Sequence, residues 1–445
     1  MAGGLKFKNI IFLLIIIVSV PVSLILLNQK TNFFNRASGT NANLIIDTSS
    51  FSGGKSESWR NLAQGGEERG RQLLPVIDKV KVLKPNYIRI DHVFDYYTAD
   101  ELDQVVRDIT VIGAKPFISL SYMPANLAKD GDVTSLPNDW QAWENLVQST
   151  VERISGRNGL NIDNVYYEVW NEPDLFGKFK YSGSKNYLEL YSRTVNGANR
   201  ARNTNNFKIG GPATTGFYEN WLNSLVKLNQ ENGVRLDFLS WHKYSKSLGD
   251  FETDLEQASH FEGYETVISE LGPNSENDKV YDEYFGGIHL IATAALMEGK
   301  VDKIFNFEIK DGVGKDKLWG RWGMLTHEKW GTPEVKPRYT AMQFLNNLIG
   351  GSSIEVAGNG SWVKSIAKRS DNKIQILIVN YDEYGTHNEA VPLRVTSLPS
   401  NSFNLKRIDF AGAINTERIE TVDNVWETTL YFKPNTASIL ELTGF

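Results

Sequence analysis

Two glutamates that each close an apolar, β-branched stretch are the residues of this chain best suited to catalysis. Glu172 follows the stretch Val165–Asn171, and Pro173 after it stops a strand because proline has no N–H to give to a sheet. Glu270 ends a second stretch, Thr266–Glu270. Glycoside hydrolysis requires such a pair of carboxyl groups, since one protonates the leaving oxygen and the other acts as base or nucleophile at the anomeric carbon.

The residues beside Glu172 suit a sugar site. Trp170 offers an aromatic face that can stack on a pyranose, and Asn171 offers an amide that can bond a hydroxyl near the reacting carbon. Glu168 either repels Glu172 by like charge or pairs with a cation inside the protein, and we favour the pairing. For Glu270 taken alone, a solvated charge or an ion pair explains the residue as well as catalysis does.

These residues need a scaffold that brings strand ends together, and residues 44–349 have the pattern of one. Short apolar runs alternate with amphipathic helical stretches such as Trp140–Ile154 and Tyr284–Met297, as in parallel βα units. The expected strands are Leu44–Thr48, Tyr87–Val93, Lys115–Ser121, Val165–Asn171, Lys208–Pro212, Asp237–His242, Thr266–Glu270 and Lys303–Glu308. We therefore expect an α/β fold with a closed (β/α)8 barrel, whose chemistry lies at the carboxyl ends of the strands.

After residue 349 the pattern changes to short strands without helices between them. The expected strands are Ile374–Asn380, Ala390–Val395, Phe403–Phe410, Trp426–Phe432 and Ser438–Leu442. They predict a C-terminal antiparallel β-sandwich domain over residues 350–445, packed on the barrel as structural support.

The N-terminus differs from the rest of the chain. Lys6 and Lys8 precede an uncharged stretch of 18 residues, Ile10–Leu27, which is just long enough to cross a bilayer. We expect residues 1–30 to form a cytoplasmic stub and a transmembrane anchor, and residues 31–43 to form a linker. A cleaved signal peptide, which would leave a secreted protein, is the alternative.

Composition excludes several other classes of function. The chain has 47 Lys plus Arg against 53 Asp plus Glu, a formal charge of -6 and no long basic run, so nucleic acid is not an expected partner. With no Cys, thiolate chemistry and thiolate-ligated metals are excluded, and the six His show no zinc-helix spacing. No Gly-rich dinucleotide or phosphate loop follows the first expected strand, and we predict no cofactor and no metal.

The motifs around the two glutamates resemble those of glycoside hydrolase family 39, which contains β-xylosidases and α-L-iduronidases. The most specific part is the segment from Glu168 to Asp174, Glu-Val-Trp-Asn-Glu-Pro-Asp, and the resemblance covers residues 44–348 as architecture. It implies a retaining clan with catalytic glutamates on barrel strands four and seven. By this resemblance Glu172 is the acid/base, Glu270 is the nucleophile and Asn171 bonds the sugar 2-hydroxyl.

Two further segments carry the resemblance. His242 and Tyr244 form a His-x-Tyr like that at the end of the family's sixth strand, which implies that they position the nucleophile and line the sugar site. Trp322-Gly323-Met324-Leu325 is similar to the stretch before the family's last barrel helix.

The sequence also departs from the family pattern. Where relatives show Arg-x-His, this chain reads Arg89-Ile90-Asp91-His92, so Arg89 is expected to hold a catalytic carboxylate ionised while a substrate contact from Asp91 or His92 stays open. On the eighth strand Phe307 replaces the usual Trp, and Asp311 is retained as a substrate-binding candidate. These changes affect substrate-facing loops, and the sugar cannot be inferred from the family.

These observations predict a retaining, β-xylosidase-like exo-glycosidase that cleaves oligo- or polysaccharides, with its catalytic domain outside the cytoplasm. A membrane-tethered endo-glycosidase that trims an extracellular or cell-wall polysaccharide is one alternative. A non-catalytic carbohydrate-binding barrel is another, although retention of both glutamates counts against it. A metal-dependent barrel hydrolase lacks a His and Asp cluster at the strand ends. Among the aromatic residues, one or two of Tyr122, Trp170, Trp241, Trp319 and Trp322 are expected to line the sugar site.

Overall fold

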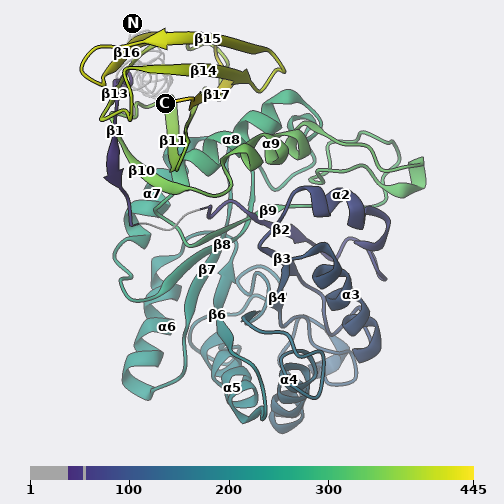
Figure 1. The fold of residues 1–445 in the computed structure, drawn as a ribbon. Coiled ribbons are helices and arrows are strands. Elements are labelled where there is room, and N and C mark those ends of the chain that lie inside the picture. Colours follow the sequence, from purple (N-terminus) through teal and green to yellow (C-terminus); the bar gives the residue numbers. More distant parts are fainter. Residues whose placement is uncertain (1–38, 54–56) are drawn as a thin grey trace, which may run out of the picture.

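The computed structural model describes residues 39–53 and 57–445, which form a barrel and an accessory sheet that lies over one side of it (Figure 1). The barrel closes in the order β2-β3-β4-β5-β6-β7-β8-β9, and every neighbouring pair of strands is parallel. Its strands are β2 (Asn61–Gln64), β3 (Tyr87–Ile90), β4 (Lys115–Ser119), β5 (Val165–Glu168), β6 (Phe207–Thr214), β7 (Phe238–Tyr244), β8 (Glu265–Gly272) and β9 (Lys303–Phe307). The expected (β/α)8 barrel is confirmed.

Eight α-helices of the described chain connect and cover these strands. They are α2 (Ile77–Val82), α3 (Ala99–Ile112), α4 (Trp140–Ile154), α5 (Tyr187–Arg200), α6 (Glu219–Asn232), α7 (Leu248–Ala258), α8 (Tyr284–Met297) and α9 (Pro337–Leu345). Local sequence fixes several helix ends. Thr98 and Glu101 form a reciprocal capping box at the start of α3, and Gly113 ends that helix with a φ of 97°, which only glycine adopts at low cost.

The accessory region is a single nine-stranded sheet, in the order β15-β14-β17-β12-β11-β10-β1-β13-β16, that encloses its own apolar core. Its strands are β1 (Leu44–Phe51), β10 (Ser352–Ala357), β11 (Val363–Ser370), β12 (Lys373–Asn380), β13 (Glu389–Thr396), β14 (Ser402–Asp409), β15 (Ile414–Glu420), β16 (Trp426–Phe432) and β17 (Thr436–Thr443). All pairs are antiparallel except β1 with β13, so the expected antiparallel C-terminal domain is confirmed, with one parallel pair.

One expected barrel strand is wrong. Leu44–Thr48 lies in β1 of the accessory sheet, and the first barrel strand is β2, which begins at Asn61. The reason is visible in the burial pattern, because buried Leu44 and Ile46 alternate with the exposed Ile45, as in a strand with one solvated face. All four residues of β2 are buried. The sequence does not identify this segment as a strand, because the polar residues at its two ends resemble those of the neighbouring loops.

The expected anchor at residues 1–30 and most of the linker at 31–43 fall outside the described residues. Within the ranges that the structure does describe, every helix is too short or too polar to cross a bilayer.

Candidate active site

The segment after β5 carries the first glutamate into the mouth of the barrel. The N–H of Val169 donates to Gly210 and that of Glu172 to Ala213, so the segment continues alongside β6 beyond the end of the strand. Trp170 and Glu172 have φ angles of 73° and 45°, a left-handed conformation that costs a non-glycine residue about 1–3 kcal/mol and is concentrated at functional sites. With positive φ angles at Trp170 and Glu172, the side chains of neighbouring residues in this segment point into different surroundings.

The second glutamate lies within β8, opposite His242 in the β7–β8 pairing. The register shifts here, because Trp241 pairs with Ile268 and His242 pairs with Glu270, so the extra residue, Ser269, lies on β8 directly before Glu270. Trp241 is buried and donates its indole N–H to Asp254, while His242 lies beside the glutamates. Glu270 keeps 8% of its side chain exposed and Glu172 keeps 14%, so both carboxyl groups are largely shielded from water.

Arg89 at the end of β3 holds the centre of the site together. Its guanidinium donates to Glu168 Oε2 at 2.8 Å, to Glu270 Oε1 at 2.8 Å and to Asn171 Oδ1 at 2.7 Å. Arg89 is therefore the cation that pairs with Glu168 inside the barrel, as expected. Because removal of one partner from a buried ion pair costs about 3–5 kcal/mol, this three-way contact fixes the two strand ends relative to each other.

His242 and Tyr244 join the two glutamates. The Nδ1 atom of His242 lies 2.9 Å from Glu172 Oε1 and 3.5 Å from Glu270 Oε2, and the hydroxyl of Tyr244 donates to Glu270 Oε2 at 2.7 Å. One oxygen of each glutamate and a nitrogen of His242 all lie within 4.8 Å of one another. Carboxyl groups about 5–5.5 Å apart are typical of retaining glycosidases, whereas inverting enzymes separate them by about 6.5–9.5 Å.

The charges in the site are strongly coupled. Burial raises the pKa of Glu270 above its ordinary value, and the nearby charges of His242 and Arg89 oppose that rise. Burial alone would lower the pKa of His242, but the carboxylates of Glu270 and Glu172 outweigh it and raise that pKa. Burial also raises the pKa of Tyr244, which keeps its hydroxyl protonated as a donor. The charges of Glu270 and His242 therefore influence each other's protonation.

The remaining residues expected at the site divide into two groups. Asn171 donates its amide to the hydroxyl of Tyr122 at 2.9 Å, and His92 bonds Asp95 at 2.8 Å and packs edge-on against Tyr122. Asp91 is buried close enough to raise the pKa of Glu270, and its Oδ1 has no hydrogen-bond partner among the described residues. These three residues border the glutamates.

Trp170 and Asp311 do not reach the site, which corrects two expectations. Trp170 is 0% exposed and packs among Trp143, Phe179 and other rings of the core, so neither face is open to a sugar. Asp311 is also fully buried, where it accepts from Lys336 Nζ at 2.9 and 3.0 Å and from the N–H of Gly323. Both residues support the scaffold.

Trp322 is better placed than Trp170 to form an aromatic wall. It is partly exposed, and its ring packs 5.3 Å from Phe307, which in turn packs 6.4 Å from Tyr244. The guanidinium of Arg321 covers part of the indole at 3.4 Å.

A buried acid just after β9 was missed at the sequence level. Glu308 accepts from Gln64 Nε2 at 3.0 Å through one oxygen, and its Oε1 has no partner within the described ranges. Burial raises its pKa well above the ordinary value, and the charge of Glu67 adds to the effect, so the protonated form of Glu308 is favoured. Its position at a strand end, the criterion that singled out Glu172 and Glu270 as candidates, was the available signal.

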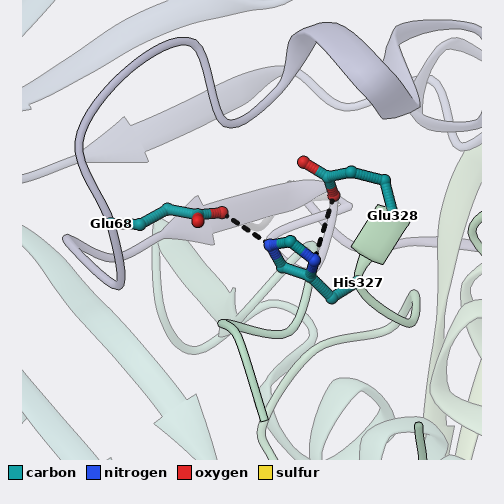
Figure 2. A group of neighbouring side chains, drawn as sticks. All are labelled: Glu68, His327 and Glu328. Carbon is teal, nitrogen blue, oxygen red and sulfur yellow. Dashed lines mark hydrogen bonds and ion pairs between the residues drawn. The ribbon is translucent and has the colours of Figure 1, made fainter. Parts of the chain in front are cut away.

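A second cluster of acids and histidine, Glu68, His327 and Glu328, lies on the loop after β2 and at the start of a short 3-10 helix, Glu328–Trp330, at the same end of the barrel (Figure 2). Lys310 places its ammonium between the two carboxylates, at 2.9 Å from Glu68 and 2.8 Å from Glu328. His327 accepts from the N–H of Lys329 through Nδ1 and lies 2.9 Å from Glu68 through Nε2, so both ring nitrogens are engaged. The cluster is an ion-pair network that ties the loop before α9 to the loop after β2.

The sequence is similar to known glycosidases. A model of the family described as glycosyl hydrolases family 39 matches residues 76–284. A β-xylosidase from Caldicellulosiruptor saccharolyticus is 28% identical over 354 residues, which cover 72% of this chain and 69% of that protein. An α-L-iduronidase from Canis lupus familiaris is also 28% identical, over 158 residues that cover 32% of this chain and 23% of that protein.

Solved structures share the fold. A monomeric β-xylosidase from Caulobacter crescentus CB15 superposes with a TM-score of 0.73 at 19% identity, and the match covers 91% of this chain and all of that one. An enzyme of the same family from Xanthomonas axonopodis gives a TM-score of 0.72 at 18% identity over 91% of this chain and 98% of that one. The shared architecture includes the accessory sheet as well as the barrel.

Proposed function

The chain belongs to glycoside hydrolase family 39, and from this premise we propose that it is a retaining, exo-acting glycosidase that removes a terminal xylose-like sugar. One observation carries the proposal. One oxygen of each of two carboxyl groups from separate strand ends lies within 4.8 Å of the other and of a nitrogen of a shared histidine, which supports a double-displacement mechanism over the wider separation of inverting enzymes.

In the first step Glu270 attacks the anomeric carbon while Glu172 donates a proton to the leaving oxygen. Arg89 and Tyr244 each donate a hydrogen bond to Glu270, which favours its carboxylate against the effect of burial. The products of this step are the free leaving group and a glycosyl ester on Glu270.

In the second step Glu172 removes a proton from water, which attacks the ester from the side that the leaving group vacated. The sugar is released with its original configuration, and both glutamates regain their starting protonation states. Asn171 is oriented for the sugar because Arg89 holds its oxygen and its amide reaches the Tyr122 hydroxyl.

A panel of aryl glycosides tests the proposal. We expect the aryl β-xyloside to be cleaved faster than the corresponding arabinoside, glucoside, galactoside and iduronide. Proton NMR of the first product should show the configuration of the substrate, before mutarotation. Release of the opposite anomer, or no cleavage of any member of the panel, would contradict the assignment.

The two alternative functions have less support. Two relatives that match over most of the chain, one in sequence and one in structure, are called β-xylosidases. A binding protein without turnover would not require the acid and nucleophile to be held at reacting distance.

We also propose that the apolar stretch Ile10–Leu27 anchors the enzyme in a membrane with the barrel outside the cytoplasm. Support comes only from the sequence, in which two lysines precede 18 uncharged residues. In a fractionation of cells that express the full chain, the protein should stay with the membranes after an alkaline wash. A shorter protein in the medium would instead indicate a cleaved signal peptide.

A further inference from the structure

The accessory sheet touches the barrel next to the nucleophile. Its strands β11, β12 and β17 pack against α8, and Figure 1 shows the sheet seated over this helix. Tyr381, directly after β12, is 3% exposed and belongs to the large apolar core of the barrel rather than to the core of its own sheet. The interface therefore extends into the catalytic domain.

Tyr381 holds the loop that follows the positioning tyrosine of the site. Its hydroxyl donates to the carbonyl of Lys246 at 2.5 Å, only two residues after Tyr244. Its ring packs against Phe285 and His289 of α8, and its own N–H donates to Trp362 of the accessory region. Tyr381 is thus fixed from both sides of the interface.

A second restraint holds the preceding carbonyl. His289 Nε2 lies 2.8 Å from the carbonyl oxygen of Ser245, and burial lowers the pKa of this histidine to about 3, so the ring is neutral and donates through Nε2. The ammonium of Lys246 bonds Asp278 at 2.7 Å, in the segment after β8. Two consecutive carbonyls after Tyr244 are therefore held, one by the barrel and one by the accessory sheet.

We propose that Tyr381 of the accessory sheet is a positioning residue for the reaction, because it fixes the strand end from which Tyr244 reaches the nucleophile Glu270. The inference rests on the proposed function. By this inference the accessory sheet contributes to catalysis through the hydroxyl of Tyr381, in addition to supporting the barrel. Since the misplacement of a catalytic group by about 1 Å can cost a factor of about 100 in rate, a small shift of this loop has a measurable effect.

The test compares the wild-type chain with Tyr381→Phe, which keeps the ring and removes only the hydroxyl. We expect kcat on the aryl β-xyloside to fall about tenfold while KM changes less than about twofold. The acid limb of kcat/KM should also move to higher pH by roughly half a unit, because a weaker bond from Tyr244 favours the protonated form of Glu270. The charged and titratable groups that face Glu270 are unchanged in this variant: Arg89, Asp91, Glu172, His242 and Tyr244.

The matched control is Glu252→Gln. Glu252 on α7 pairs with Lys364 of the accessory sheet at 2.7 Å, so the variant weakens the same interface without touching the loop 245–247. It should keep the wild-type pH profile and kcat. Unfolding midpoints from circular dichroism ensure that both variants are assayed well below the temperature at which they unfold.

A double-mutant cycle with Tyr244→Phe separates positioning from stability. If Tyr381 acts through Tyr244, its removal should shift the acid limb little further once the Tyr244 hydroxyl is gone. An active wild type with a Tyr381→Phe variant that matches the Glu252→Gln control would overturn the inference and leave the proposed function intact. A wild type that cleaves none of the glycosides would instead refute the proposed function.

Discussion

Replacement of Glu270 by alanine should reduce kcat on an aryl β-xyloside by a factor on the order of 10⁵, because no glycosyl ester can form without the carboxylate. This factor corresponds to about 7 kcal/mol of transition-state stabilisation. Added azide should restore part of the rate by entering the space that the side chain leaves. NMR of the glycosyl azide should show the inverted configuration, since azide attacks from the face of the lost nucleophile and is not displaced again.

The control for this variant is Glu265→Gln at the opposite end of the same strand. Glu265 accepts from the hydroxyl of Tyr166 at 2.6 Å, far from the strand ends that carry the site, and its replacement should leave turnover within about threefold of wild type. Full turnover by Glu270→Ala, or an azide product of retained configuration, would show that another residue is the nucleophile.

Replacement of Glu172 by alanine should produce a different kinetic pattern. For substrates with poor leaving groups, kcat/KM should fall about 10²- to 10⁴-fold, because the departing oxygen leaves without a proton. For aryl glycosides with acidic phenols the loss in kcat/KM should be small, while kcat falls because water attacks the ester without a base. Azide needs no base, so it should accelerate this variant and give a glycosyl azide with the retained configuration.

A plot of log kcat/KM against the pKa of the leaving phenol measures this effect, and its slope should be steeper for Glu172→Ala than for wild type. Asp174→Asn is the matched control, because Asp174 lies two residues away and accepts from the N–H of Thr215 at 3.1 Å. Equal slopes for the wild type and Glu172→Ala would assign the acid role elsewhere.

The proximity of Glu172 and Glu270 could be predicted from the sequence because strand ends in a parallel barrel meet at one rim. An apolar run that stops at a polar residue marks such an end without any knowledge of distant contacts. Seven of the eight barrel strands were recognisable by this signal, and the ion pair between Arg89 and Glu270 followed from the need to hold a carboxylate ionised.

The expectations for Trp170 and Asp311 were not met, because contacts outside the local sequence segment determine where these two side chains lie. Trp170 lies two residues before Glu172 in sequence, but at its positive φ angle its ring packs in the core. Asp311 matches a family position, yet it is paired with Lys336, which lies 25 residues further along the chain. No periodicity or spacing signals either event.

The strand β1 has a consequence for how the protein is made. This segment precedes the entire barrel in the chain, but its partners β10 and β13 both follow the barrel. During synthesis β1 must wait, unpaired, until the ribosome has produced the complete catalytic unit. The accessory sheet can therefore form around β1 only after the barrel, which lies between β1 and β10 in the chain, has been synthesised.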